Sequence, residues 1–314
     1  MITRFFRISK PFHYVLFFGA LILVYFLQRG NYLYTAQHLN FLLELAIFSS
    51  FLVSIFLMIF IITKNNLTQN NSFAALYFSL FILLVPESIA EPKVIFSNMF
   101  VLLAFRRIFS FQTKINFKKK YFDAGLWLSL ATVFYVWAIL YFIPLLATIF
   151  LWKTDQVKHL FVIIFGALSV FVITLISNII LNTDLPDLVL ELPTQEIDFY
   201  SSLTFQLKIS MALIMVISIC SFFTTLNQLV FKNIQTRSLF ITLYLMFLTG
   251  VLIFLITYDK TPKNLLFLTF PLAVIAANFT QMKKTLWTAT LFILTLIIFV
   301  AVRCYDHIKF ILEI

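Results

Sequence analysis

The sequence predicts an all-α fold, a polytopic transmembrane bundle of about eleven helices. Hydrophobic residue types make up 62% of the 314 residues and charged types 11%, whereas soluble proteins average about 45–50% and about 25%. The mean hydropathy is +1.01. The apolar residues form continuous runs, without the alternation typical of a β-barrel strand. These observations exclude a water-soluble enzyme, a disulfide-rich secreted scaffold, a coiled coil and a disordered regulator.

Ten apolar runs follow one another along the chain, and most approach the length of about 20 residues that a membrane-spanning helix needs. The runs cover residues 12–27, 39–62, 73–85, 94–105, 124–152, 160–181, 205–230, 239–258, 265–279 and 286–302. The first run is expected to remain as a helix, because no small-residue cleavage site of a signal peptide accompanies it.

The run 124–152 is long for one helix and short for two, and the charges of the loops decide between them. With a cytoplasmic N-terminus, a hairpin of two short helices places more Lys and Arg residues in cytoplasmic loops than a single helix does. The positive-inside rule therefore favours the hairpin. The predicted bundle has its N-terminus in the cytoplasm and its C-terminus outside.

Several predicted helices are short, namely 73–85, 94–105, both halves of the hairpin and 265–279. Short or proline-interrupted segments often mark a site inside a membrane protein. The alternative is that flanking Arg and Lys side chains snorkel and lengthen these helices. Both interpretations stay open at this stage.

The predicted cytoplasmic segment 106–122 interleaves cations with aromatic residues, a pattern that suits the headgroup layer of a membrane. Its candidate lipid-headgroup residues are Arg106, Arg107, Lys118, Lys119 and Lys120. The simpler interpretation is an anchor that fixes orientation. Nucleic acid is not an expected partner, because the segment lacks a solvated stripe with base-reading side chains.

The predicted outer loop 182–204 is acidic and contains no Lys or Arg. Asp184 and Asp187 are candidates for a general base or for oxygen ligands of a cation. The favoured alternative is a solvated acidic loop. The four histidines and two cysteines are scattered, so neither a metal site nor a cofactor is predicted.

Two ionisable residues, Glu44 and Lys208, fall inside apolar runs near the predicted outer face. A charge within the membrane is costly, so such residues are functional candidates by default. One alternative is that Glu44 and Lys208 pair with each other. The other is that Lys208 contacts the acidic loop 182–204. Glu87 and Glu91 lie in another outer loop. The candidate ligand-binding residues are therefore Glu44, Lys208, Glu87 and Glu91, and Glu44 is also a weak catalytic candidate.

Three stretches, 123–131 (DAGLWLSLA), 143–146 (IPLL) and 268–273 (LTFPLA), resemble the GT-C class of membrane glycosyltransferases. The chain is also similar to uncharacterised multi-pass inner-membrane proteins of Gram-negative bacteria. The resemblance implies one integrated domain in three parts. These are a seven-helix GT-C-like module at 1–181, the acidic extracytoplasmic loop at 182–204, and a C-terminal four-helix segment at 205–314.

One departure from the GT-C pattern bears directly on activity. The resemblance implies a catalytic carboxylate in the first outer loop, but residues 28–38 contain neither Asp nor Glu. Glu44 is the nearest carboxylate and does not occupy the family position. Without a general base, transfer from a polyprenyl-linked donor loses its proton acceptor. The expectation is a protein that binds such a lipid with little or no transferase chemistry.

The expected function is therefore a role in envelope assembly, with binding of a lipid phosphate, such as polyprenyl phosphate, or of a lipid-linked glycan. Three alternatives remain: an active polyprenyl-phosphate-sugar-dependent glycosyltransferase, a transporter or flippase, and a structural subunit of a membrane complex. The expected partners are membrane lipids and other membrane proteins.

Overall fold

The computed structural model describes residues 5–35, 38–152, 156–181, 205–227, 233–257, 262–282, 290 and 293–301. Within these ranges the chain forms helices and no strands, which confirms the predicted all-α class. The α-helices are α2 (Pro11–Thr35), α3 (His38–Lys64), α4 (Phe73–Leu84), α5 (Pro92–Phe109), α6 (Phe117–Phe134), α7 (Phe142–Leu151), α8 (Gln156–Leu181), α10 (Phe205–Leu226), α11 (Ile234–Ile256) and α12 (Leu266–Met282). Residues 293–301 are helical as well.

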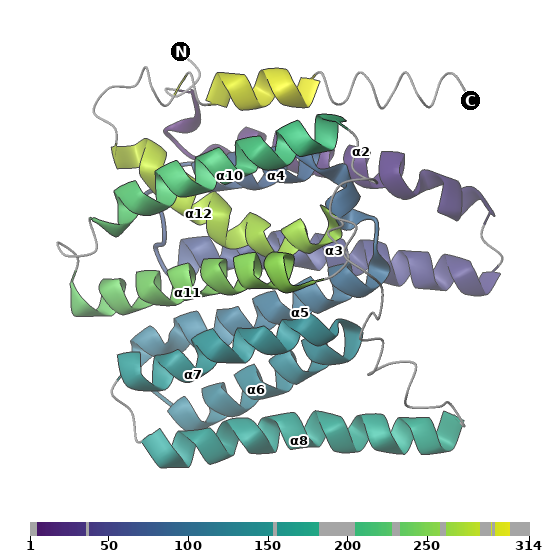
Figure 1. The fold of residues 1–314 in the computed structure, drawn as a ribbon, viewed down its shortest axis with the longest axis vertical. Helices are drawn as coiled ribbons and strands as arrows, with labels where there is room; N and C mark the ends of the chain where they lie inside the picture. The colour runs from purple at the N-terminus through teal and green to yellow at the C-terminus, as the bar shows by residue number, and fades with distance from the viewer. Residues whose placement is uncertain are drawn as a thin grey trace.

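Seven helices in the described part of the chain are long and apolar enough to cross a membrane, which fits a multi-pass membrane protein. Figure 1 shows the helices side by side and alternating in direction, so that the connections gather at two ends of the bundle. One end holds the short helices η1 (Pro86–Ile89) and η5 (Pro262–Leu265), and we call it the η1 end. The opposite end, where α5 ends and α6 begins, is called the basic end.

The predicted hairpin is confirmed. After α6 the chain turns at Tyr135, which has extended dihedral angles (φ −148°, ψ 107°), and passes through η3 (Val136–Tyr141) into α7. Pro144 lies in the first turn of α7, where a backbone N–H has no partner within the helix. The helix bounds differ from the apolar run, because α6 begins at Phe117 and includes the three lysines that precede the run.

Of the segments predicted as short helices, one is lengthened by its flanking residues and another stays short and buried. The run 94–105 extends at both ends into α5, which begins at Pro92 and includes Arg106 and Arg107 in its last turn. Its 18 residues reach about 27 Å. By contrast, α4 stays at 12 residues and is buried almost throughout. A helix too short for the bilayer is thus accommodated by burial among its neighbours.

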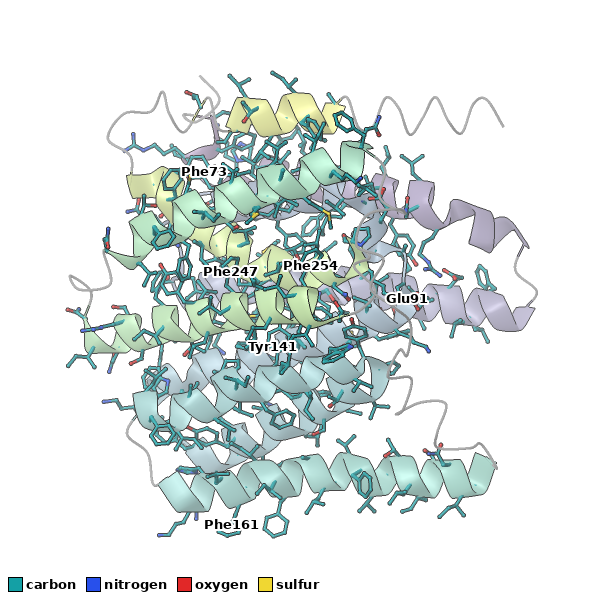
Figure 2. The ribbon with its side chains drawn as sticks, in the orientation of Figure 1. Phe73, Glu91, Tyr141, Phe161, Phe247 and Phe254 are labelled. Atoms are coloured by element: carbon teal, nitrogen blue, oxygen red, sulfur yellow. The ribbon has the colours of Figure 1, made fainter. Side chains whose placement is uncertain are left out.

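The centre of the bundle is formed by α4 and α12, which pack against each other. The α12 span is 94% buried, whereas the α8 span at the edge of the bundle is 17% buried. Figure 2 shows Phe161 of α8 pointing away from the other helices. An apolar side chain at such a position is compatible with contact to lipid.

Phenylalanine holds α5 and α6 together. The Phe100 ring stacks on Trp127 and on Phe134, with ring centroids 5.8 Å and 5.5 Å apart, and Phe96 also stacks on Phe134. Aromatic pairs in this distance range contribute about 0.5–1.5 kcal/mol beyond their buried area. Some of the 41 phenylalanines of the chain therefore serve to pack helices against each other.

On its other side, α6 packs against α8 through two glycines. A Cβ atom at Gly125 would lie 2.7 Å from the Ile163 carbonyl oxygen, and one at Gly166 would lie 2.5 Å from the Phe122 carbonyl oxygen. Only glycine permits so close an approach of two backbones, as in other membrane helix pairs. The Ala-Gly pair that contributed to the GT-C resemblance thus lies in a helix-packing contact.

Pro271 lies inside α12 and cannot donate a backbone hydrogen bond to the Phe267 carbonyl one turn earlier. The Tyr141 hydroxyl from η3 donates to that carbonyl at 3.3 Å. Gly250 of α11 lies beside this contact, since a Cβ atom there would lie 2.8 Å from Leu268 Cδ2 and 3.3 Å from the Tyr141 hydroxyl oxygen. A neighbouring element therefore satisfies the carbonyl that the proline leaves open, as is usual in membrane helices.

Candidate functional site

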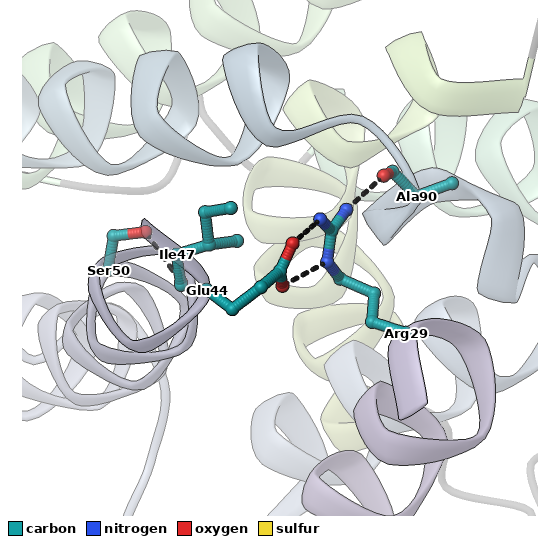
Figure 3. A network of polar contacts seen from close by, with 5 residues as sticks. All are labelled: Arg29, Glu44, Ile47, Ser50 and Ala90. Carbon is teal, nitrogen blue, oxygen red and sulfur yellow. Dashed lines mark hydrogen bonds and ion pairs between the residues drawn. The ribbon is translucent and has the colours of Figure 1, made fainter. Parts of the chain in front are cut away.

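A buried ion pair joins α2, α3 and the η1 segment at the η1 end (Figure 3). The Arg29 guanidinium donates to both carboxylate oxygens of Glu44, from Nε to Oε2 at 3.0 Å and from Nη2 to Oε1. Its Nη1 donates to the Ala90 carbonyl. Arg29 is 4% exposed and Glu44 is 6% exposed. Such a bidentate pair with a further acceptor satisfies charges that are costly to bury alone.

The residues around this pair fix its position. Tyr25, one turn earlier on α2, is fully buried and packs its ring against Phe48 and Phe51 of α3. These contacts hold α2 and α3 in the register that the bidentate geometry requires. The pair therefore ties the α2–α3 hairpin to the rest of the bundle.

Glu44 has a partner that the sequence interpretation did not consider. The sequence left open a pairing of Glu44 with Lys208, whereas in the structure both carboxylate oxygens of Glu44 bind Arg29. Arg29 was assigned to a loop, although α2 continues to Thr35. A signal was present, since one Arg and one Glu flank the first short connection. Any role of Glu44 as a general base would require this pair to open first.

The other candidate ligand-binding residues lie at the same end but on separate elements. Glu87 belongs to η1 and Glu91 precedes α5, and both are half-buried. Figure 2 shows Glu91 at the η1 end. Lys208 lies one turn into α10, which packs against α12. The catalytic candidates Asp184 and Asp187, with the whole loop 182–204, lie outside the described residues.

The predicted lipid-headgroup residues gather at the basic end. Lys118 and Lys119 are exposed at the start of α6. Arg106 and Lys64 each lie 5.1 Å from the centroid of the Phe60 ring. Two cations on one ring concentrate positive charge at this surface and suit an anionic headgroup layer.

The remaining two headgroup candidates also make internal contacts. Arg107 pairs with Asp123 of α6 at 3.0 Å. The Lys120 ammonium donates to the Ser110 carbonyl and to the Thr113 hydroxyl, both at 2.7 Å. These bonds close the turn between α5 and α6 and bring the exposed cations to one face.

A large apolar groove lies between α10, α11 and α12, with a volume of about 450 Å³. Its lining includes Met211, Met215, Phe222, Phe247, Phe254 and Leu268, of which Figure 2 marks Phe247 and Phe254 on α11. Ser218 is its one polar lining residue among those described, and its hydroxyl is bonded to the Met215 carbonyl. The groove runs from Met211 to Phe223 along α10, which corresponds to about 18 Å of helix.

Lys208 lies on the face of α10 that lines this groove. It precedes Met211 and Ala212 by three and four residues, and side chains at these spacings share one face of a helix. Lys263 of η5 lies two residues before Leu265, which also lines the groove. An apolar groove with cations near one end matches the division of a phosphorylated lipid into tail and headgroup. No signal in the apolar run of α10 predicts the groove.

Two histidines in the described helices, His13 and His159, have structural surroundings. His13 Nδ1 lies 2.8 Å from the Ser72 hydroxyl oxygen, and His159 packs its ring against Tyr121. Among the residues that the structure describes, no three His, Cys, Asp or Glu side chains are grouped to hold a metal ion.

Comparison with known proteins identifies a family. Residues 8–311 match a protein family described as a family of unknown function, DUF6427. No curated protein and no solved structure matches the chain. The resemblance to GT-C enzymes therefore stays a prediction. Because the match covers nearly the whole sequence, the chain belongs to the DUF6427 family.

Proposed function

We propose that this protein is a multi-pass protein of a bacterial inner membrane that binds a lipid phosphate or a lipid-linked glycan. The lipid tail lies in the groove between α10, α11 and α12, and its phosphate lies at the η1 end. The protein performs little or no transferase chemistry. Its place is in envelope assembly, where such lipids carry glycans across or along the membrane.

The groove is the observation that carries this proposal. It has a volume of about 450 Å³ and an almost wholly apolar lining from three helices. An unbranched or prenyl chain fits a long apolar groove better than a polar solute does. Lys208, on the same helix face, places a positive charge at the end where a phosphate would lie.

Two observations favour binding over the alternatives. Glu44, the nearest carboxylate to the first outer loop, is held in the pair with Arg29. Apart from tyrosines, the ionisable side chains that are buried in the described helices are His13, Arg29, Glu44 and His159. They do not form a row across the bundle, as a polar transport path would require.

The experiment is native mass spectrometry of the full chain in nanodiscs, with polyprenyl phosphate and the uncharged polyprenol as probes. Met215→Trp fills the groove and is expected to weaken binding of both probes about tenfold. Phe165→Trp, at an exposed position on α8, is the matched control and leaves binding unchanged.

The phosphate contact is tested separately. Lys208→Gln is expected to weaken binding of polyprenyl phosphate about fivefold, the equivalent of one lysine near an anionic group, and to leave polyprenol unaffected. Arg237→Gln, at an exposed position near the start of α11, is the matched control. Equal binding of polyprenyl phosphate to wild type and to Met215→Trp would overturn the proposal.

A further inference from the structure

A second cleft lies at the basic end, shares no lining residue with the groove and differs from it in chemistry. It is formed by the start of α2, the end of α3, the connection 65–72 and the start of α4, and has a volume of about 80 Å³. Its polar lining residues are Ser9, Tyr14, Thr63, Asn66, Thr68, Gln69, Asn70 and Asn71. None of its lining residues in the described chain carries a charge.

The backbone of the connection 65–72 is held firmly. Asn278 of α12 donates to the Leu67 carbonyl at 2.9 Å, and the Gln69 amide donates to the Gln281 side chain at 3.2 Å. The Ser72 amide donates to the Phe6 carbonyl at 3.1 Å. Bonds from both the N-terminal segment and α12 therefore fix the shape of the cleft.

The side chains of the cleft, by contrast, have few partners. In the part of the chain that the structure describes, no hydrogen bond engages the Tyr14 hydroxyl, the Thr68 hydroxyl or the Asn70 amide. Asn71 also lines the cleft and is 8% exposed, and its side-chain oxygen accepts a hydrogen bond from the Phe73 amide. A rigid frame thus presents hydroxyl and amide groups that are ready to bind a ligand.

The size and chemistry of the cleft limit what it can bind. Its volume corresponds to two or three water molecules at about 30 Å³ each, so it takes one end of a ligand. Hydroxyl and amide groups both donate and accept, and so does a pair of neighbouring hydroxyl groups. Below them, Met58, Ile62, Ala74 and Ala75 offer apolar contact to the attached C–H groups.

The position of the cleft limits the ligand further. It lies at the helix ends of the basic end, where a bilayer that the helices span would have its lipid headgroups. Lys10 follows the lining residue Ser9, and Lys64 follows the lining residue Thr63. Their positive charges suit a phosphate just outside a neutral cleft.

We propose that the cleft between α2, α3 and α4 is a headgroup site that binds the vicinal hydroxyl groups of a glycerol or sugar headgroup. The hydroxyl pair enters the cleft, its C–H groups rest on the apolar floor, and any linking phosphate stays at the lysine rim. The site is independent of the groove between α10 and α12, because the two share no lining residue.

The test compares two lipids of equal charge that differ in the diol. Native mass spectrometry of the full chain measures binding of phosphatidylglycerol and of phosphatidylmethanol with the same acyl chains. Phosphatidylglycerol is expected to bind about threefold to tenfold more tightly, the equivalent of one or two hydrogen bonds. Equal binding of the two lipids to the wild-type protein, together with no binding of a hexose in the arms below, overturns the proposal.

The variants Tyr14→Phe and Thr68→Val remove hydroxyl groups with little change of shape. Combined, they are expected to abolish the preference for phosphatidylglycerol while the melting temperature in detergent stays unchanged. Thr224→Val, at an exposed hydroxyl on α10, is the matched control and keeps the preference. A preference that persists in the Tyr14→Phe and Thr68→Val double variant also overturns the proposal, because another surface then reads the diol.

Two further arms distinguish the sources of the diol. Monohexosyl diacylglycerol tests a glycolipid, and free glucose tests a soluble sugar, each against the wild type and the double variant. Binding that requires Tyr14 and Thr68 supports the site and identifies its source.

Discussion

The ion pair at the η1 end and the cleft at the basic end are both polar sites in an apolar bundle, but they use their polar groups differently. Both carboxylate oxygens of Glu44 bind Arg29, which also binds the Ala90 carbonyl. In the cleft, the backbone of the connection 65–72 is bonded, while several side chains face the cavity. The comparison separates polar groups that hold helices together from polar groups that remain available for a ligand.

The largest expected effect comes from breaking the ion pair. Glu44→Ala leaves the buried Arg29 without its counter-charge, and we expect a loss of about 3–5 kcal/mol in stability, measured as a lower melting temperature in detergent. Replacing both partners, by Arg29→Met with Glu44→Leu, is expected to restore most of the loss. Glu91→Ala, at a half-buried carboxylate, is the control. A Glu44→Ala protein as stable as wild type would remove the structural role of the pair.

A smaller effect is expected from the glycine contact between α6 and α8, which holds helices without polar groups. Gly166→Ala places a Cβ atom 2.5 Å from the Phe122 carbonyl oxygen, and we expect a loss of about 1–3 kcal/mol. Gly19→Ala is the matched control, since nothing lies within 4 Å of its Cβ position. Equal melting temperatures for the two variants would show that α8 shifts without cost.

The bond between Tyr141 and the Phe267 carbonyl is expected to contribute a similar or smaller amount. Tyr141→Phe leaves that carbonyl without its donor, and the expected loss of stability is about 1–3 kcal/mol. In the background of Pro271→Ala, which restores the helix amide of residue 271, the same change is expected to cost less. A double-mutant cycle of melting temperatures measures this coupling. Additive effects would show that the hydroxyl does not compensate for the proline.

The smallest effect on stability is expected in the cleft. Thr68→Val and Asn70→Ala remove side chains that bond to nothing in the described chain, so each is expected to change stability by less than about 0.5 kcal/mol. The same variants are expected to weaken phosphatidylglycerol binding in native mass spectrometry. A large loss of stability would show that these residues hold the fold together, as the ion pair does, and are not available for a ligand.

Much of the fold follows from the sequence because the apolar runs are long and the loop charges are unequal. The hairpin at 124–152 and the eleven helices were predicted on these grounds. Helix bounds were less accurate, because a run stops at the first charge while the helix continues. In this way α5 includes Arg106 and Arg107, and α2 includes Arg29.

The sites were harder to predict, for a different reason. The connection 65–72 is a polar loop in the sequence, and its shape depends on Asn278, which is 211 residues away from Leu67. The groove depends on how α10 packs against α11 and α12, which hydropathy does not encode. Glu44 was recognised as unusual because a lone charge in an apolar run is costly, but its partner depended on the true end of α2.

The burial of α4 against α12 has a consequence for how the chain is made. Synthesis runs from the N-terminus, so α4 leaves the ribosome long before the helix that covers it. With only 12 residues, α4 is too short to cross a bilayer alone. Until α12 is inserted, the insertion machinery or the helices already inserted must cover α4. A chain that ends before α12 would therefore lack the helix that packs most extensively on α4.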